Sequence, residues 1–495
     1  MVLLSRLLRY LLVGSAFFFL TLYTVLAIIR IQYPFELEWM EGCSLLHVQR
    51  ILAGYKLYVQ PSLSFTPFIY NPLYFYVAAA VSSLLGADFF SLRLVSLLSS
   101  VGCFWLIYSI VANESDRWVG IIAAGLFAAT FRLSGAWFDI ARVDSLFLFM
   151  FLGAVFIIRR WRSEKATVIA AILVSLSFLT KQTALVLLVP LGIYFCFGAR
   201  KKFLYFTATV VFLIGGCILI FDRIHEGWYT YYAFYLPQNF PSDEFQFLDF
   251  ILNDILWPFP LASLIAIVFL IQKFRTGNRD QLVFYSLFLL GMLAASWLSR
   301  GRIQGYDNAL IPAYAAICIL FGLGLHTLLD LIPQIFPRHH YRIAALLYAV
   351  CIAQFALMKY DPLAQLPADA DLRAGKELIG MVAQFDGDVF IPNHPYLAVM
   401  AGKTPHALSI CLRDVWRGDT GSIPSTLLSE LKSAIEQRQF GAIILDGPEF
   451  SLLPLFEFQF EEFYQHRQGF EEDSQIFVPV TGWPAKPLNI YMPRH

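Results

Sequence analysis

The chain has 495 residues, of which 58% are hydrophobic and 15% are charged, whereas soluble domains carry nearer a quarter charged residues. This composition excludes a soluble globular protein. The 36 basic residues balance the 36 acidic ones, so the overall charge gives no reason to expect a nucleic-acid partner. The spacing of the seven cysteines predicts neither a zinc motif nor a disulfide framework.

Apolar runs suited to crossing a bilayer recur along the chain. The first run is longer than the apolar core of a signal peptide and lacks a small-x-small cleavage site, so we interpret it as a retained helix. The runs predict a polytopic all-α membrane protein with about 11 transmembrane helices, at residues 10–30, 92–112, 118–138, 145–158, 167–180, 183–197, 203–221, 256–272, 281–299, 309–331 and 342–358.

Basic residues indicate the orientation, because cytoplasmic loops of membrane proteins collect Lys and Arg. Placing the basic clusters in the cytoplasm puts the N-terminus inside and two large loops, 31–90 and 222–254, outside. We therefore expect a multi-pass protein of the inner (plasma) membrane, with its C-terminal part periplasmic. The clusters contain Arg6 and Arg9, Arg159, Arg160, Arg162 and Lys165, Arg200, Lys201 and Lys202, Lys273, Arg275 and Arg279, and Arg338 and Arg342.

Residues 72–85 (PLYFYVAAAVSSLL) are apolar enough to resemble a span, but counting them as one would move the four later basic clusters outside. They are also short for a span. We expect a helix lying in the outer interface, with nearby tyrosines at the headgroup level. The first outer loop is therefore predicted to contain juxtamembrane helices.

The chain changes character after the last predicted span, because charge rises from Asp361 onward and the apolar runs shorten. Residues 388–392 and 442–446 are typical of buried strands, and residues 425–437 of an amphipathic helix. The sequence thus predicts a transmembrane catalytic domain, 1–358, and a small extracytoplasmic α/β domain, 359–495.

Ionisable residues gather on the outer side of this topology, where they are costly near a bilayer and often functional. They suggest an outward-facing cavity. A carboxylate there can deprotonate a hydroxyl or bind a metal, while Arg and Lys can hold a phosphate. One of them, Glu36, is expected to be a solvated loop acid. The others are Glu38, Glu41, Arg142, Asp144, Lys181, Asp222, Arg223, His225, Glu226, Arg300, Arg302 and Asp307.

Short motifs in their order along the chain resemble the GT-C class of membrane glycosyltransferases, in its protein O-mannosyltransferase and aminoarabinose transferase-like branch. The resemblance covers about residues 8–330. It implies a glycosyltransferase that moves a hexosyl or pentosyl group from a polyprenyl-phosphate carrier to an envelope lipid, glycan or protein acceptor on the outer face. The motifs are EWMEG (38–42), FIYNPLYFY (68–76), RLVSLLSSVGCFWLIY (93–108), ARVDSLF (141–147), LTKQTALVLLV (179–189) and GYDNALIP (305–312).

The resemblance also implies residue roles. Glu41 precedes Gly42 as in the family's acidic-Glu-Gly pattern and would be the base or a metal ligand. Met40 stands where relatives often have Asp, which leaves Glu38 as a substitute. Asp144 would carry the second acidic role. The implied ligands of the donor phosphate are Arg142, Lys181, Arg300 and Arg302, and those of a divalent metal cofactor, if one is used, are Glu41, Asp144 and His225.

Other hypotheses stay open at this point. A transporter or flippase of a lipid-linked saccharide would usually show internal repeats and broken helices meeting at mid-membrane, and the sequence has no visible repeat. A non-catalytic assembly subunit is a third hypothesis. Within the enzyme hypothesis, Arg142 and Asp144 could form only a structural ion pair, and Lys181 could simply extend to the interface.

Overall fold

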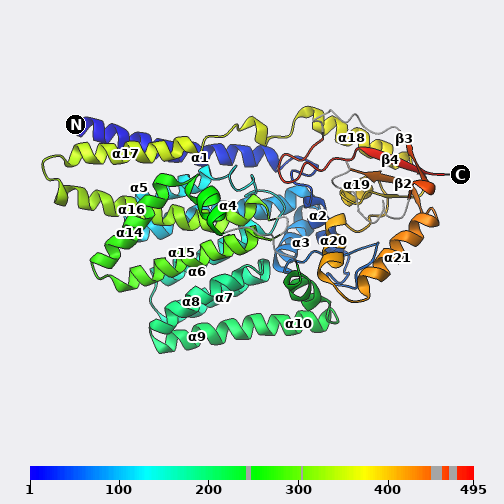
Figure 1. Cartoon of the computed structure of the whole chain (residues 1–495), viewed down its shortest axis with the longest axis horizontal. Coiled ribbons are helices and arrows are strands. Elements are labelled where there is room, and N and C mark those ends of the chain that lie inside the picture. The colour runs from blue at the N-terminus through cyan, green and yellow to red at the C-terminus, as the bar shows by residue number, and fades with distance from the viewer. Residues whose placement is uncertain (241–246, 303–304, 447–459, 468–476, 495) are drawn as a thin grey trace.

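A bundle of long helices holds the N-terminus at one end of the molecule, and a small mixed unit holds the C-terminus at the other (Figure 1). The computed structural model describes residues 1–240, 247–302, 305–446, 460–467 and 477–494. A helix forms at each of the 11 predicted spans. They are α1 (Val2–Arg30), α4 (Phe89–Glu114), α5 (Arg117–Ala129), α6 (Asp144–Arg160), α7 (Glu164–Thr180), α8 (Ala184–Phe197), the continuous run α9, η1 and α10 (Arg200–Val210, Val211–Gly215, Gly216–Ile224), α14 (Pro260–Arg275), α15 (Arg279–Arg300), α16 (Ile311–Ile335) and α17 (His340–Leu357).

Fewer of these helices are by themselves long and apolar enough to cross a bilayer. Among the described residues, six helices are long and apolar enough, or seven if Phe247–Leu256 and Pro260–Arg275, which meet at a bend of 104°, form one span. The α5 prediction was too long, because the helix ends at Ala129 rather than near residue 138. Gly135 and Ala136 follow with positive φ angles of 70° and 53°, which an α-helix does not accommodate.

Ion pairs hold the bundle together near the end that carries the N-terminus. Arg159, at the end of α6, contacts Glu114 of α4 at 2.5 Å and Asp280 of α15 at 3.1 Å. Arg159 and Glu114 are nearly buried, with exposed side-chain fractions of 5% and 6%. The strongest predicted basic cluster therefore lies where three helices meet, at the opposite end of the molecule from the C-terminal unit.

The two predicted outer loops contain short helices. The first has α2 (Glu41–Leu52) and α3 (Leu73–Leu85), and α3 coincides with the helix predicted at residues 72–85. The second has α11 (Trp228–Thr230), η2 (Tyr231–Tyr235), α12 (Leu236–Gln238), α13 (Phe247–Asp249) and η3 (Phe250–Leu256).

The C-terminal unit is mixed α/β, as the sequence predicts. Its four strands have the order β1-β2-β4-β3, with β1 and β2 parallel and β4 antiparallel to both of its neighbours. Its elements are η5 (Leu363–Gln365), α18 (Asp369–Gln384), β1 (Asp388–Phe390), α19 (Pro395–Met400), α20 (Ser409–Gly418), α21 (Ile423–Glu436), β2 (Phe440–Leu445), η7 (Phe460–Glu462), β3 (Tyr464–Arg467) and β4 (Asn489–Pro493). In addition, η4 (Asp307–Leu310) precedes α16 in the bundle.

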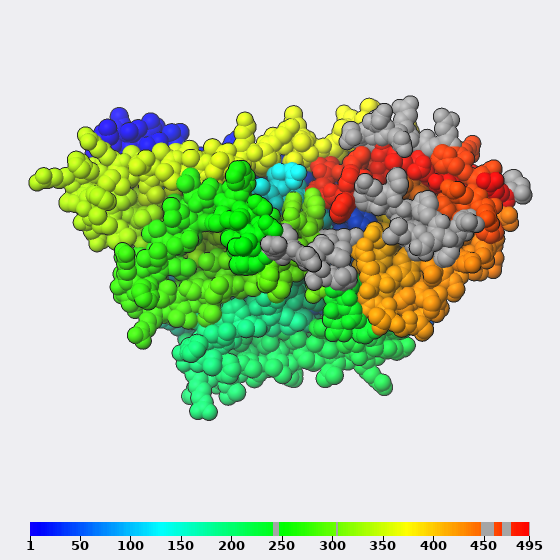
Figure 2. All heavy atoms as spheres, in the orientation of Figure 1, coloured from blue at the N-terminus to red at the C-terminus, as the bar shows by residue number. Residues whose placement is uncertain are grey.

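One apolar core joins the outer loops to this unit. Tyr74 of α3, Tyr232 of η2 and Leu397 of α19 all belong to it. Tyr231 donates a hydrogen bond to Asp419 at 2.6 Å, and Figure 2 shows the orange surface of α20 and α21 against the green of the second loop. The division of the chain near residue 358 stays a prediction, but the two outer loops and the C-terminal unit pack as neighbours.

Candidate active site

The irregular segment between α5 and α6, residues 130–143, is the hub of the candidate site. It makes a sharp turn at Gly135, where an added Cβ would lie 2.5 Å from a ring atom of Tyr306. The segment then runs past Trp137 and Arg142 to Asp144, the first residue of α6. These side chains project from a turn that lies beside the ends of several helices, so they contact groups from distant parts of the chain.

Asp144 links two of those parts to the hub segment. Lys181, at the tip between α7 and α8, contacts Asp144 Oδ1 at 2.6 Å. Asn308 of η4 donates to the same oxygen at 3.1 Å, and Trp137 Nε1 donates to Oδ2 at 2.9 Å. The structure thus brings Asp144 and Lys181 together. Asn308 lies in the GYDNALIP motif, but it received no role from the sequence because an uncharged amide does not stand out among the ionisable candidates.

Three aromatic rings surround the guanidinium of Arg142, and two of its nitrogen atoms are left without a hydrogen-bond acceptor among the described residues. Its guanidinium lies 5.3, 5.1 and 5.7 Å from the ring centroids of Phe68, Tyr70 and Trp137. Nη2 donates to the Tyr70 hydroxyl at 2.9 Å. The Nε and Nη1 atoms are buried and find no hydrogen-bond partner among the described residues. Unpaired N–H donors on a buried guanidinium suit an arriving phosphate or carboxylate oxygen.

Glu41, in contrast, is fully engaged. Its Oε1 and Oε2 accept from Arg93 Nε and Nη2 at 2.9 and 2.6 Å, and backbone amides of Ala141 and Leu37 add bonds of 2.6 and 2.7 Å. Burial alone would raise the pKa of Glu41, but Arg93 and the backbone amides outweigh it, so the pKa is lowered. A carboxylate held in this way is a poor proton acceptor. The sequence analysis gave Arg93 no role, although a charged residue near the start of an apolar helix often marks a functional position.

Glu38 has the opposite environment. Its side chain has no exposed surface; Oε2 accepts from the Met40 amide at 3.2 Å, and Oε1 has no partner in the described part of the chain. Burial raises the pKa of Glu38 to about 8, with the nearby charge of Arg142 opposing the rise. Glu38 is therefore the carboxylate of this region with a free oxygen and a pKa near neutrality.

A strap, residues 480–485, covers Glu38. Thr481 donates from its amide to Leu37 O at 3.0 Å and from its hydroxyl to Gly135 O. The Gly482 amide donates to the Tyr306 hydroxyl at 3.2 Å. A Cβ added at Gly482 would lie 2.9 Å from Glu38 Cγ and 3.1 Å from its Oε1. The C-terminal unit thereby supplies one wall of the candidate site.

A buried charge triad connects the same unit to the first loop. His394 Nδ1 lies 2.5 Å from Glu36 Oε2, and Nε2 lies 3.2 Å from Asp446 Oδ2. Burial raises the pKa of Glu36 to about 8, and the two acids hold the pKa of His394 near 10 against the effect of burial. The expectation that Glu36 is solvated was wrong, because docking of the C-terminal unit buries it.

The remaining predicted phosphate ligands lie at the periphery. Arg300 contacts Asp254 at 3.3 Å and Asp307 at 3.4 Å. It therefore reaches the Asp144 network only through η4, which carries both Asp307 and Asn308. Arg302 donates to the Pro237 carbonyl.

The predicted metal ligands do not come together. His225 bonds through Nδ1 to Tyr58 O at 3.1 Å, while Glu41 is held by Arg93 and Asp144 by Lys181. No group of three His, Cys, Asp or Glu side chains in the described ranges is arranged to hold a metal ion. These three residues therefore do not fit a shared metal site, and we derive no step through a metal.

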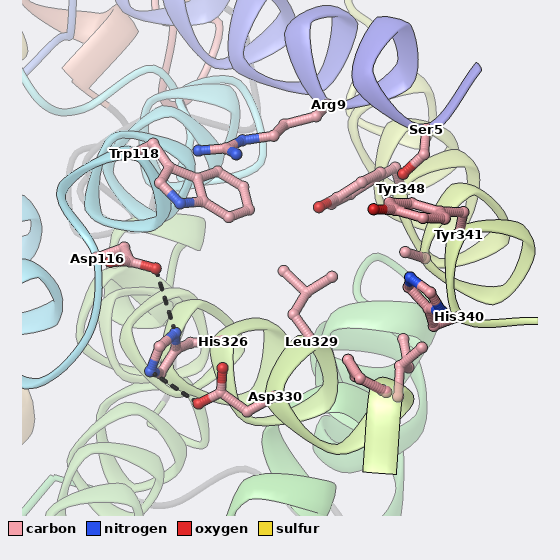
Figure 3. Close-up of a pocket in the computed structure, with 13 residues that line it drawn as sticks. Ser5, Arg9, Asp116, Trp118, His326, Leu329, Asp330, His340, Tyr341 and Tyr348 are labelled. Carbon is pink, nitrogen blue, oxygen red and sulfur yellow. Dashed lines mark ion pairs between the residues drawn. The ribbon is translucent and has the colours of Figure 1, made fainter. Parts of the chain in front are cut away.

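A cavity of about 350 Å³ lies in the bundle, between α1, α5, α16 and α17 (Figure 3). His326 contacts Asp116 at 3.6 Å and Asp330 at 3.2 Å, and Arg9 lies over the ring of Trp118. None of the predicted acids or donor ligands lines this cavity, so it is separate from the candidate active site.

Comparisons with known proteins agree with this arrangement. Residues 67–221 match the family model "Dolichyl-phosphate-mannose-protein mannosyltransferase". ArnT from Cupriavidus metallidurans in the apo state superposes with a TM-score of 0.59 and 12% identity, over 97% of this chain and 98% of that one. The chain has the GT-C fold. The GT-C resemblance predicted from the sequence is confirmed at this level.

Two further relatives extend the comparison. The GT-C fold is shared with the oligosaccharyltransferase AglB from Archaeoglobus fulgidus, with a TM-score of 0.51 and 12% identity over 87% of this chain and 69% of that one. An uncharacterized protein of Aquifex aeolicus (strain VF5) is 27% identical over 267 residues, which are 51% of this chain. The matching segment spans 59% of the length of that protein.

Proposed function

We propose that this chain is a membrane glycosyltransferase that takes a sugar from a polyprenyl-phosphate carrier and joins it to an acceptor on the outer face. The GT-C fold and the family match over residues 67–221 support the proposal. So do the similar structures, since one ArnT structure is bound to undecaprenyl phosphate and one AglB structure to a dolichol-phosphate. The acceptor class is an envelope lipid, glycan or protein, and the sugar is a hexose or pentose.

One observation carries the proposal: a buried carboxylate with a free oxygen lies within the electrostatic reach of a buried guanidinium with two free donors. These groups are Glu38 and Arg142. A lone buried guanidinium is costly unless a partner anion arrives. A phosphate oxygen that accepts from one of these free N–H groups supplies that partner, with Lys181 at the neighbouring Asp144 adding a second cation.

In the proposed reaction, Glu38 accepts the proton of the acceptor hydroxyl as the hydroxyl oxygen attacks the anomeric carbon of the sugar. The bond from that carbon to the phosphate oxygen breaks, and its electron pair stays on the departing polyprenyl phosphate. Arg142 and Lys181 stabilise the charge that develops there. Glu41 positions the loop through Arg93 and takes no proton.

The proposal includes an orientation, with the N-terminus cytoplasmic and the C-terminal unit outside. The positions of the basic clusters support it, because α6 begins in the candidate site at Asp144 and carries Arg159, with its acidic partners, at its other end. The donor phosphate then enters at the outer membrane rim, where a polyprenyl chain can remain in lipid.

Mass spectrometry of lipid-linked and envelope glycans, with and without the gene, identifies the sugar. Transfer of that radiolabelled sugar from its lipid carrier is then measured in isolated membranes. Arg142→Gln is expected to abolish transfer, whereas the exposed-residue control Arg223→Gln keeps it. Full transfer by Arg142→Gln overturns the assignment, and flipping of the carrier in proteoliposomes without a covalent product would establish the transporter hypothesis instead.

A further inference from the structure

The cysteines divide into two groups by position. Five of the seven lie in helices of the bundle: Cys103, Cys196, Cys217, Cys318 and Cys351. The other two, Cys43 and Cys411, lie outside it, on α2 of the first outer loop and on α20 of the C-terminal unit. They are the chain's two cysteines in segments predicted to be extracytoplasmic, and they are far apart in sequence.

The fold brings these two thiols together. The Cys43 and Cys411 side chains lie within hydrogen-bonding reach of each other. Both are buried, with exposed fractions of 2% and 0%, in the core that joins the first loop to the C-terminal unit. Structural disulfides form on the outer side of the membrane, where both segments are predicted to lie.

The surroundings of Cys43 suit thiol chemistry. His47 Nε2 accepts a hydrogen bond from the Phe68 amide at 2.9 Å, so its Nδ1 carries the proton. That Nδ1–H donates to Cys43 O at 2.7 Å and lies 3.5 Å from the Cys43 sulfur. Burial would raise the pKa of the Cys43 thiol, but Cys411, His47 and Arg142 outweigh it and lower the pKa.

We propose that Cys43 and Cys411 form a disulfide that staples the C-terminal unit to the first outer loop. One thiolate of the pair attacks a disulfide of a thiol–disulfide oxidoreductase of the outer compartment, and the other thiolate then displaces that protein's sulfur. The two thiols lose two electrons and two protons, and the oxidoreductase disulfide becomes a dithiol. The exchange takes place before docking is complete, because the docked pair is buried.

The staple acts on the geometry of the candidate site. Cys43 lies on α2, which begins with Glu41, three residues after Glu38. Arg142 acts electrostatically on both sulfurs, so the bond lies beside the proposed phosphate site. The inference requires both segments to lie outside the cytoplasm and is independent of which sugar is transferred.

The test counts thiols on the full-length protein in membranes. Cells are quenched in acid and the protein is denatured with a small alkylating reagent, with or without prior reduction, and intact mass gives the number of alkylated cysteines. Of the seven cysteines, two more are expected to react after reduction than before. Cys43→Ser and Cys411→Ser should each give equal counts under both conditions. The control Cys196→Ser, at an exposed residue of α8, should keep the difference of two.

Digestion without reduction should also yield one linked peptide pair that contains both residues, and reduction should lower the melting temperature of the wild type but not of Cys43→Ser/Cys411→Ser. Equal counts with and without reduction in the wild type overturn the proposal. Because the count needs no sugar donor, it stands or falls separately from the transfer assay.

Discussion

Arg93 and Glu41 form a bidentate ion pair in which neither side chain has any exposed surface. Arg93 also donates to the carbonyls of Tyr33 and Phe35, each at 2.5 Å. This pair fixes the backbone that precedes α2 and so determines where Glu38 stands. The acid that the family pattern favours as the base is, in this geometry, part of the support of the site.

Breaking that ion pair should lower the stability of the protein, so any loss of activity would reflect unfolding and not a missing catalytic group. Glu41→Gln leaves a buried guanidinium without its counter-charge, which costs about 3–5 kcal/mol. We expect a clear fall in melting temperature in detergent, together with lost activity. The double variant Arg93→Met/Glu41→Leu should recover part of the stability. Unchanged melting of Glu41→Gln would show that the pair contributes little.

Glu38→Gln should separate chemistry from stability. The substitution keeps the shape of the side chain and removes the proton acceptor, so transfer should fall by about 10²- to 10⁴-fold. The melting temperature should not fall, since the variant removes a buried ionisable group. Glu226→Gln is the matched control, because that side chain is 75% exposed. Wild-type transfer rates in Glu38→Gln would remove Glu38 from the mechanism.

The pH profile of transfer should follow Glu38. Because burial raises its pKa to about 8, the carboxylate is the ionised base above that pH and protonated below it. The kcat/KM for the donor should fall about tenfold per pH unit below 8 and level off above 8. Residual activity of Glu38→Gln should lack this dependence. A flat profile between pH 6 and 8 contradicts the assignment.

Docking of the C-terminal unit should weaken as pH rises. The pKa of His394 is raised from 6.5 to about 10, so its contribution to stability is complete below 6.5 and is lost as pH rises toward 10. Glu36, whose pKa is raised to about 8, contributes in the same direction because its ionisation in the folded state is costly. Thermal unfolding across pH 6.5–10 measures the effect. His394→Gln should flatten it, and the exposed-residue control His466→Gln should not.

The strap can be tested with two glycines that share a backbone conformation. Gly482 and Gly402 have φ angles of +79° and +74°. A Cβ added at Gly482 would contact Glu38, whereas a Cβ added at Gly402 would have no atom within 4 Å. Alanine at either position destabilises the folded state by about 1 kcal/mol, because a residue with a Cβ disfavours the left-handed backbone conformation. Gly482→Ala should in addition reduce transfer severalfold. Equal activity of the two variants would mean that the strap does not constrain Glu38.

The sequence predicted the helices well, because each long apolar run has one way to satisfy its backbone in lipid. It failed at the end of α5, where the turn around Gly135 depends on Tyr306, more than 150 residues later in the chain. It also anticipated that Asp144 and Lys181 belong to one side of the membrane, and the structure joins them at 2.6 Å.

The division of labour among the acids after α1 could not be read from the sequence. Glu36, Glu38 and Glu41 stand within six positions of one another, and what distinguishes them is the partner that each meets. Those partners are His394, the strap at Gly482 and Arg93. Two of the three lie in the C-terminal unit, and no local sequence pattern predicts that this unit packs against the first outer loop.

The strap has a consequence for the order of biosynthesis. Glu38 leaves the ribosome early, whereas Thr481 and Gly482 follow hundreds of residues later. Throughout membrane insertion the carboxylate is therefore uncovered, in contact with water and with its pKa free to be ordinary. Glu38 acquires its raised pKa only when residues 480–485 dock over it, so a nascent or truncated chain would be inserted in the membrane but inactive.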